Sequence, residues 1–166
     1  MNTNTILLLL VRELEGFRRE LQLFPDEQSL WRVVPGVANS AGNLAIHVAG
    51  NLQHYVGAVL GQSGYIRHRD IEFSRQSGSL AEILMELDRA ENEVRRVLPQ
   101  LTDAQLEAEY PEPVGHMKFQ TGQLLVHLCV HAGFHLGQAG YLRRAMTGDP
   151  TSSGPLPLQP IAIAAM

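Results

Sequence analysis

Two stretches of this sequence place polar side chains at helical spacing among apolar neighbours. The first holds a row of residues that steps by four, four and three: Asn43, His47, Asn51 and His54. The second holds a row that steps by four three times and then by three: Gln123, His127, His131, His135 and Gln138. At about 100° per residue, each row forms one narrow stripe along a helix. Most other positions in both stretches are aliphatic, which predicts that both helices are buried.

Buried imidazoles at this spacing predict a metal site. A buried polar group without a hydrogen-bond partner costs roughly 1–3 kcal/mol, so several buried histidines need a reason. His131 and His135 lie four residues apart and can chelate one ion, and His47 from the other helix can complete a set of three. Three protein ligands leave a position open, as in catalytic sites. Because bound imidazoles must be neutral, metal affinity is expected to fall below a pH of about 6.5.

The three histidines alone do not determine which metal ion binds. Three imidazoles suit zinc, nickel, copper and iron. We expect one divalent ion and favour zinc or nickel. The alternative is a hydrogen-bonded polar layer between two helices, which is the better interpretation of a single buried histidine. Several histidines on two apolar helices favour the metal.

Other metal and thiol chemistries fit the spacing poorly. His131 and His135 enclose Ala-Gly-Phe, which lacks the glutamate of the H-E-x-x-H peptidase motif. Neither stripe holds a carboxylate, whereas di-iron bundles use Glu-x-x-His pairs, and no obvious carboxylate base lies near the stripes. The single cysteine, Cys129, lies about 200° around the helix from His127 and is expected in the core.

Five further side chains are candidates for supporting roles. His54 and His127 can act as a ligand, as a base or as a support that orients a ligating imidazole, and Gln138 can act as such a support or contact a substrate. Arg67 and Arg69 can bind an anionic substrate, although a charged loop is more often simply solvated. These assignments remain alternatives at the level of sequence.

The stripes need helices to position them, and the 3.6-residue periodicity predicts four. They are expected at residues 5–24, 41–60, 79–98 and 121–146. Three residues have the position and type of N-caps: Ser40, Ser79 (with a capping box to Glu82) and Thr121. Residues 99–120 form a long crossover in which Thr102 can cap one short helix. The connection lengths predict an all-α, four-helix bundle with long crossovers.

The chain is expected to form one bundle domain over residues 1–148. Residues 149–166 contain Pro, Ser and Gly and are expected to form a tail without secondary structure. The apolar segment Ile161-Ala162-Ile163 is a candidate to dock on the bundle or on a partner.

Charge and composition exclude several classes of partner. There are 13 basic and 17 acidic residues and no dense basic run, so neither nucleic acid nor an anionic membrane is an expected partner. The apolar run Ile6–Val11 is too short to span a membrane and does not resemble a signal peptide. One cysteine permits no intrachain disulfide. A cytoplasmic protein is therefore expected.

These motifs resemble the DinB/YfiT-like superfamily over about residues 1–148. The resemblance is concentrated in His47-Val-Ala-Gly-Asn-Leu-Gln-His54, in Gly64-Tyr-Ile-Arg67 with Arg69-Asp70, and in His127-x3-His131-x3-His135-Leu-Gly137-Gln138. It implies that His47, His131 and His135 are the metal ligands. It also implies a four-helix bundle with long crossovers that is often a homodimer. Characterised relatives include transferases and isomerases that use low-molecular-weight thiols.

Three functions follow from this sequence. The first is a metal-dependent enzyme, a transferase or hydrolase that acts through a metal-activated thiol or water on a small-molecule substrate. The second is a non-catalytic homodimeric bundle that binds a metal or a ligand. The third is a structural homodimer in which the histidines are only polar packing. A family resemblance does not by itself fix the reaction.

Overall fold

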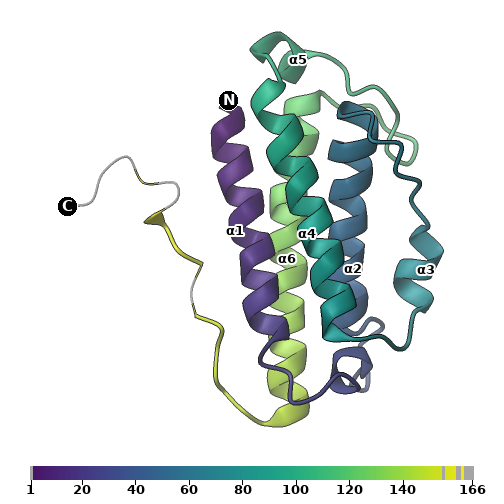
Figure 1. Ribbon diagram of the computed structural model, residues 1–166, viewed down its shortest axis with the longest axis vertical. Coiled ribbons are helices and arrows are strands. Elements are labelled where there is room, and N and C mark those ends of the chain that lie inside the picture. The colour runs from purple at the N-terminus through teal and green to yellow at the C-terminus, as the bar shows by residue number, and fades with distance from the viewer. Residues whose placement is uncertain (1, 155, 160–161, 163–166) are drawn as a thin grey trace.

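The computed structural model describes residues 2–154, 156–159 and 162, and its centre is a bundle of four long helices (Figure 1). The long helices are α1 (Thr3–Leu21), α2 (Ala41–Leu52), α4 (Leu80–Val97) and α6 (Thr121–Thr147). A π-helical segment, Gln53–Leu60, continues α2. Two short helices are α3 (Arg69–Ser74) and α5 (Asp103–Glu107). The described ranges hold isolated β-bridges but no strand, so the expected all-α, four-helix bundle with long crossovers is confirmed.

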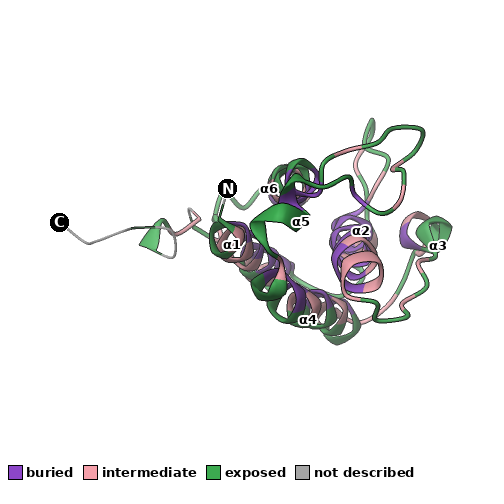
Figure 2. Cartoon of the chain, turned by 90° about the horizontal axis from the view of Figure 1, so that it is seen from above, coloured by how far each residue is buried: buried purple, intermediate pink, exposed green. Residues whose placement is uncertain are grey.

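The four long helices form a ring around an aliphatic core. Helix α1 packs against α4 and α6, and α2 packs against the same two helices from the opposite corner (Figure 2). The core is built from buried side chains of all four helices, among them Leu10, Leu14, Phe17, Val48, Leu87, Val94 and Leu125. This arrangement brings α2 and α6 side by side, so that His47 of the first stripe meets His131 and His135 of the second.

The helix starts follow the cap residues in two of the three expected places. The Ser40 side chain accepts a hydrogen bond from the Asn43 backbone N–H at 3.1 Å, and Ser79 does the same for Glu82 at 3.2 Å, each within a full capping box. The expected cap at Thr121 is wrong. Gln120 occupies the N-cap position without a side-chain bond, and the Thr121 hydroxyl instead donates to the Ala108 carbonyl oxygen at 3.3 Å.

The helix boundaries differ by a few residues from those expected. Helix α1 begins at Thr3 and ends at Leu21, before the expected end at Phe24. Pro25 disfavours helical geometry at the residue before it, and the chain turns away early, although Phe24 still packs in the core. Helix α6 ends at Thr147, where Gly148 adopts a left-handed conformation with φ of 69°.

The crossover between α2 and α4 contains a helix that the sequence did not predict. The later part of the charged stretch that begins at Arg67 forms α3, which packs on the outer side of α2 (Figures 1 and 2). Glu72 on α3 is 4% exposed and therefore belongs to the interior. The other expected short helix, capped by Thr102, is present as α5.

The tail leaves the bundle after α6 and contains no α-helix in its described part, residues 149–154, 156–159 and 162. It still contacts the bundle, because the buried Arg143 guanidinium donates to the Thr151 carbonyl oxygen. Ile161 and Ile163, expected as a docking segment, lie outside the described residues. The division into a bundle of residues 1–148 and a tail of residues 149–166 stays a proposal.

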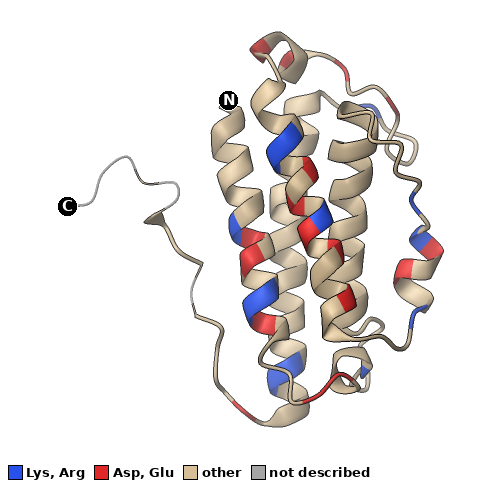
Figure 3. Ribbon diagram, viewed as in Figure 1, with Lys and Arg blue, Asp and Glu red and all other residues tan. Residues whose placement is uncertain are grey.

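Charged residues are frequent along α1 and α4, where Glu13 and Glu20 are buried and the others are partly or fully exposed. In Figure 3 both signs are interspersed along α1 and α4, and Arg18 of α1 pairs with Asp88 and Glu91 of α4 at 2.7 and 2.8 Å. Among the described residues, none of the helices combines the length and apolar character needed to cross a membrane.

Candidate metal centre

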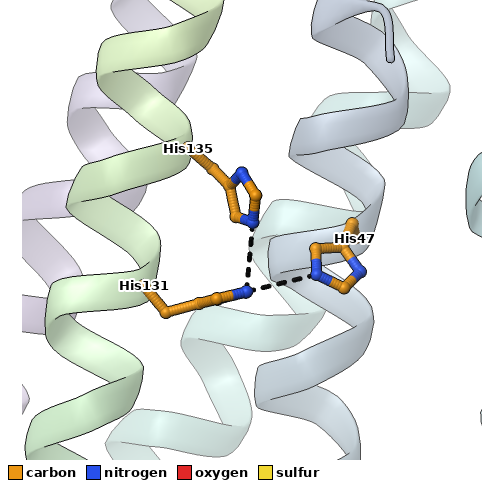
Figure 4. Close-up of side chains that lie close together, drawn as sticks. All are labelled: His47, His131 and His135. Carbon is orange, nitrogen blue, oxygen red and sulfur yellow. Dashed lines mark hydrogen bonds between the residues drawn. The ribbon is translucent and has the colours of Figure 1, made fainter. Parts of the chain in front are cut away.

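Three histidine rings meet between α2 and α6. Figure 4 shows His47 from α2 pointing at His131 and His135, which lie one turn apart on α6. His131 Nε2 lies 3.2 Å from His47 Nε2 and 3.1 Å from His135 Nε2. Candidate ligand atoms of all three residues lie within 4.8 Å of one another. The structure thus brings together the three residues that the sequence singled out.

The spacing of these nitrogens fits one shared ion. Nitrogen ligands of a tetrahedral zinc site lie about 2.0–2.1 Å from the metal, which places them about 3.3 Å from each other. The distances from His131 Nε2 to the Nε2 atoms of His47 and His135, 3.2 and 3.1 Å, are close to that value. Only small shifts of the side chains are needed to accommodate an ion.

Neighbouring acceptors determine which ring nitrogens carry protons. His47 Nδ1 lies 2.8 Å from a carboxylate oxygen of Glu72, nearer than the Arg67 Nη2 donor at 3.2 Å, and His135 Nδ1 lies 2.7 Å from the amide oxygen of Gln138. Both oxygens only accept hydrogen bonds, so each Nδ1 is the donor and each Nε2 keeps its lone pair. If His131 Nε2 carries a proton, it can donate it to His47 Nε2 or to His135 Nε2, but not to both. At least one lone pair therefore points to the centre of the cluster without a proton donor from His131, which is the arrangement that a metal ion requires.

Glu72 is the carboxylate that the sequence reasoning missed. It lies on α3, outside both stripes, and corrects the expectation that no carboxylate stands near the site. Arg67 donates to its two oxygens at 2.7 Å each. Burial alone would raise the pKa of Glu72, but hydrogen bonds from Arg67 and His47 outweigh burial and lower it. The carboxylate is therefore charged at neutral pH and stabilises the Nδ1 proton of His47.

The imidazoles of His131 and His135 on α6 are held neutral. Burial lowers the pKa of His131 to about 3, and the neighbouring His135 and His47 add to this effect. Burial also lowers the pKa of His135, although its hydrogen bond with Gln138 opposes the shift. Protons therefore displace a metal ion from His131 and His135 only at a pH below the ordinary histidine pKa of about 6.5. The expected decline of metal affinity moves to lower pH.

The remaining candidates lie around the three histidines rather than among them. His54 Nε2 lies 2.7 Å from a Glu112 oxygen. His127 is exposed, with its ring centroid 5.9 Å from that of His131. Arg69 stacks over the Phe73 ring at 5.0 Å, whereas Arg67 is committed to Glu72.

Cys129 packs against the core, as its position on the helix predicted. Its sulfur lies 3.9 Å from the Ile6 carbonyl oxygen. Burial raises the pKa of the Cys129 thiol to about 12, with the nearby Glu13 carboxylate adding to the shift. This thiol is therefore not a nucleophile at neutral pH.

Close packing between α2 and α3 explains why Glu72 reaches the site. Gly50 of α2 faces α3, and a Cβ at this position would overlap Glu72 Oε1. The Asn43 side-chain amide donates to the carbonyl oxygens of Glu72 and Arg75 at 2.9 and 2.8 Å, which anchors α3 to α2. Gly50 stands in the sequence between His47 and Asn51, but nothing in the local pattern shows which segment approaches it.

Comparison with known families agrees with the geometry. A model of the DinB superfamily matches residues 9–139, which is well over half of the chain and includes the three clustered histidines. No curated protein matches the chain.

Proposed function

Because the chain belongs to the DinB superfamily, we propose that it is a metal-dependent enzyme in which His47, His131 and His135 hold one divalent ion. The observation that supports this most is the convergence of their Nε2 atoms, with the Nδ1 protons of His47 and His135 engaged by Glu72 and Gln138. Zinc and nickel are our first choices for the ion. Cytoplasmic location is part of the proposal and is supported by the single cysteine.

The proposed reaction is either the transfer of a chemical group to a small molecule or the hydrolysis of a small molecule. When bound, an ion held by three imidazoles supplies Lewis acidity that lowers the pKa of a water or thiol beside it. The chain's own residues orient the site: Glu72 holds the Nδ1 proton of His47, and Arg67 holds Glu72 in place. Because burial against the core raises the pKa of the half-buried Cys129 thiol to about 12, the proposed thiol nucleophile comes from a low-molecular-weight cosubstrate.

A pocket that is connected to the three histidines through Gln138 supports a small-molecule substrate. A cavity of about 470 Å³ lies between residues 34–39 and the C-terminal half of α6. Among the described residues, its lining includes Leu44, Tyr141 and Leu142 and no charged side chain. Gln138, which bonds His135 Nδ1, also lines this cavity. The size is typical of ligand sites, and the lining suits an uncharged, largely apolar part of a substrate.

A homodimer is the proposed assembly. Helix α6 exposes large apolar side chains along one outward face: Val126 (40%), Val130 (66%), Phe134 (60%) and Tyr141 (75%). An apolar stripe of this kind on a surface helix is typical of an interface. Light scattering tests this proposal, and a mass near 18 kDa at all concentrations would contradict it.

The alternative is a bundle that binds a metal or a ligand without turnover. One observation favours it: the carboxylate nearest the three histidines, Glu72, is already occupied by Arg67 and His47 and is not free to move a proton. Under this alternative the apolar cavity binds a ligand and releases it unchanged.

Turnover assays separate enzyme from binding module. Zinc-loaded and nickel-loaded protein would be tested with cysteine or glutathione plus chlorodinitrobenzene for thiol transfer, and with p-nitrophenyl acetate for hydrolysis. We expect the turnover rate of at least one metal-loaded form of the parent to exceed that of the His131→Ala variant. Equal rates for the metal-loaded parent and this variant across the screen would favour the binding module.

A further inference from the structure

A fourth side chain reaches the point where the three histidines meet. Asn51 lies one turn beyond His47 on α2 and is 6% exposed. Its Nδ2 lies 3.1 Å from His47 Nε2 and 3.4 Å from both Nε2 and Nδ1 of His131. These separations from the two Nε2 atoms match the spacing of ligands that share one ion, about 3.3 Å.

The Asn51 amide presents its N–H group, not its oxygen, to the histidine nitrogens. Its N–H group donates to the lone pair of His47 that an ion would take, and an N–H dipole facing a cation is repelled. The two ends of a carboxamide are nearly the same in shape, so a half-turn replaces Nδ2 by Oδ1 with little movement. Within the part of the chain that the structure describes, no hydrogen bond engages Asn51 Oδ1. The half-turn therefore breaks no other interaction of the amide.

We propose that Asn51 turns its amide when an ion binds and that its Oδ1 becomes the fourth protein ligand beside His47, His131 and His135. This inference rests on the proposed metal site and adds to it. All four ligands are then uncharged, so the ion keeps its full positive charge and its strength as a Lewis acid. A neutral amide oxygen is also the weakest donor of the four. It is the ligand that a substrate can displace most easily.

Two substitutions of Asn51 test the assignment by the direction of their effects. Leucine has a similar size and removes the donor atom, whereas aspartate keeps an oxygen at the same place. Zinc affinity would be measured by competition with a chromophoric chelator. We expect Asn51→Leu to lower the affinity about tenfold or more, and Asn51→Asp to match or exceed the parent. Asn92→Leu, at an exposed position on α4, controls for the chemical change, and circular dichroism controls for folding.

NMR spectra of the side-chain amides, recorded while zinc is added, measure directly whether Asn51 contacts the ion. We expect the Cγ and Nδ2 signals of Asn51 to shift, while those of Asn43, whose amide is bound to α3, stay in place. An Asn51→Leu variant with parental zinc affinity would overturn the inference and leave the three-histidine site intact. A loss of affinity in both Asn51 variants would also overturn it, because the amide would then act through its N–H group. A parent that binds no zinc would refute the proposed metal site as well.

Discussion

Glu72 accepts a hydrogen bond from Nδ1 of His47 at 2.8 Å, although 25 residues of sequence separate them. The same carboxylate receives two hydrogen bonds from Arg67, so the orientation of one candidate ligand depends on a short helix outside the bundle. Pairs of a carboxylate and a histidine are the usual way of orienting a metal-binding imidazole.

Replacing Glu72 by glutamine tests this dependence. The variant removes the charge that stabilises the Nδ1 proton of His47 but keeps the shape of the side chain. Zinc affinity, measured by chelator competition, is expected to fall about 10–100-fold. Glu112→Gln is the matched control, because Glu112 makes a similar contact with His54, which is not one of the three clustered histidines. An equal effect of both substitutions would contradict the role assigned to Glu72.

A second prediction concerns Gly50, where α2 and α3 approach closely. A methyl group here would overlap Glu72 Oε1, so Gly50→Ala is expected to displace Glu72, lower zinc affinity and cost about 1–3 kcal/mol of stability. Gly137→Ala is the matched control on α6, because nothing lies within 4 Å of the added Cβ. That variant is expected to gain up to about 1 kcal/mol from helix propensity and to bind zinc as the parent does. Urea unfolding and chelator competition check both.

The stability of the metal-free protein is expected to depend on the protonation of His131. In the folded protein burial lowers the pKa of His131 to about 3, whereas in the unfolded chain it is about 6.5. Between these values the unfolded state binds the extra proton, so the free energy of unfolding falls as the pH decreases below 6.5. Urea unfolding at pH 7 and pH 5 measures this loss.

The His131→Gln variant isolates this contribution. Without the imidazole, the decrease in the free energy of unfolding from pH 7 to pH 5 should be smaller than in the parent. His116→Gln is the control, because His116 lies in an exposed turn. A parental pH dependence in His131→Gln would mean that His131 does not titrate as described.

Cys129 gives a prediction about thiol chemistry. With a pKa raised to about 12, this thiol should react with a disulfide reagent at pH 8 far more slowly in the folded protein than in urea. The measurement is absorbance of the released thiolate over time. Fast reaction of the folded protein would show an accessible thiolate and would make Cys129 itself a candidate nucleophile.

The sequence predicted the bundle and the three histidines because both depend on regular spacing. His131 and His135 share a helix face by their separation alone, and Ser40 and Ser79 are caps of well-defined chemistry. The register between α2 and α6, which brings His47 to His131, follows from packing that no local pattern encodes.

The parts that the sequence did not predict depend on contacts between distant segments. Helix α3 has six residues, too few for a clear periodicity, and its charged residues resemble those of a solvated loop. Glu72 is buried only because Gly50 and Asn43 allow α3 to pack on α2. Thr121 has the right type for a cap, but it is the first residue of α6, and Gln120, which forms an isolated bridge with Glu109, holds the N-cap position.

Metal content of the histidine variants tests the central claim most directly. After reconstitution and desalting, elemental analysis and native mass spectrometry should find about one zinc or nickel ion per chain in the parent, and none in His131→Ala and His135→Ala. His47→Ala should bind more weakly or with altered geometry, and the loop variants His68→Ala and His116→Ala should match the parent. Parental metal content in both His131→Ala and His135→Ala, or a parent that binds no metal, would contradict the account and leave the histidines as a hydrogen-bonded polar layer.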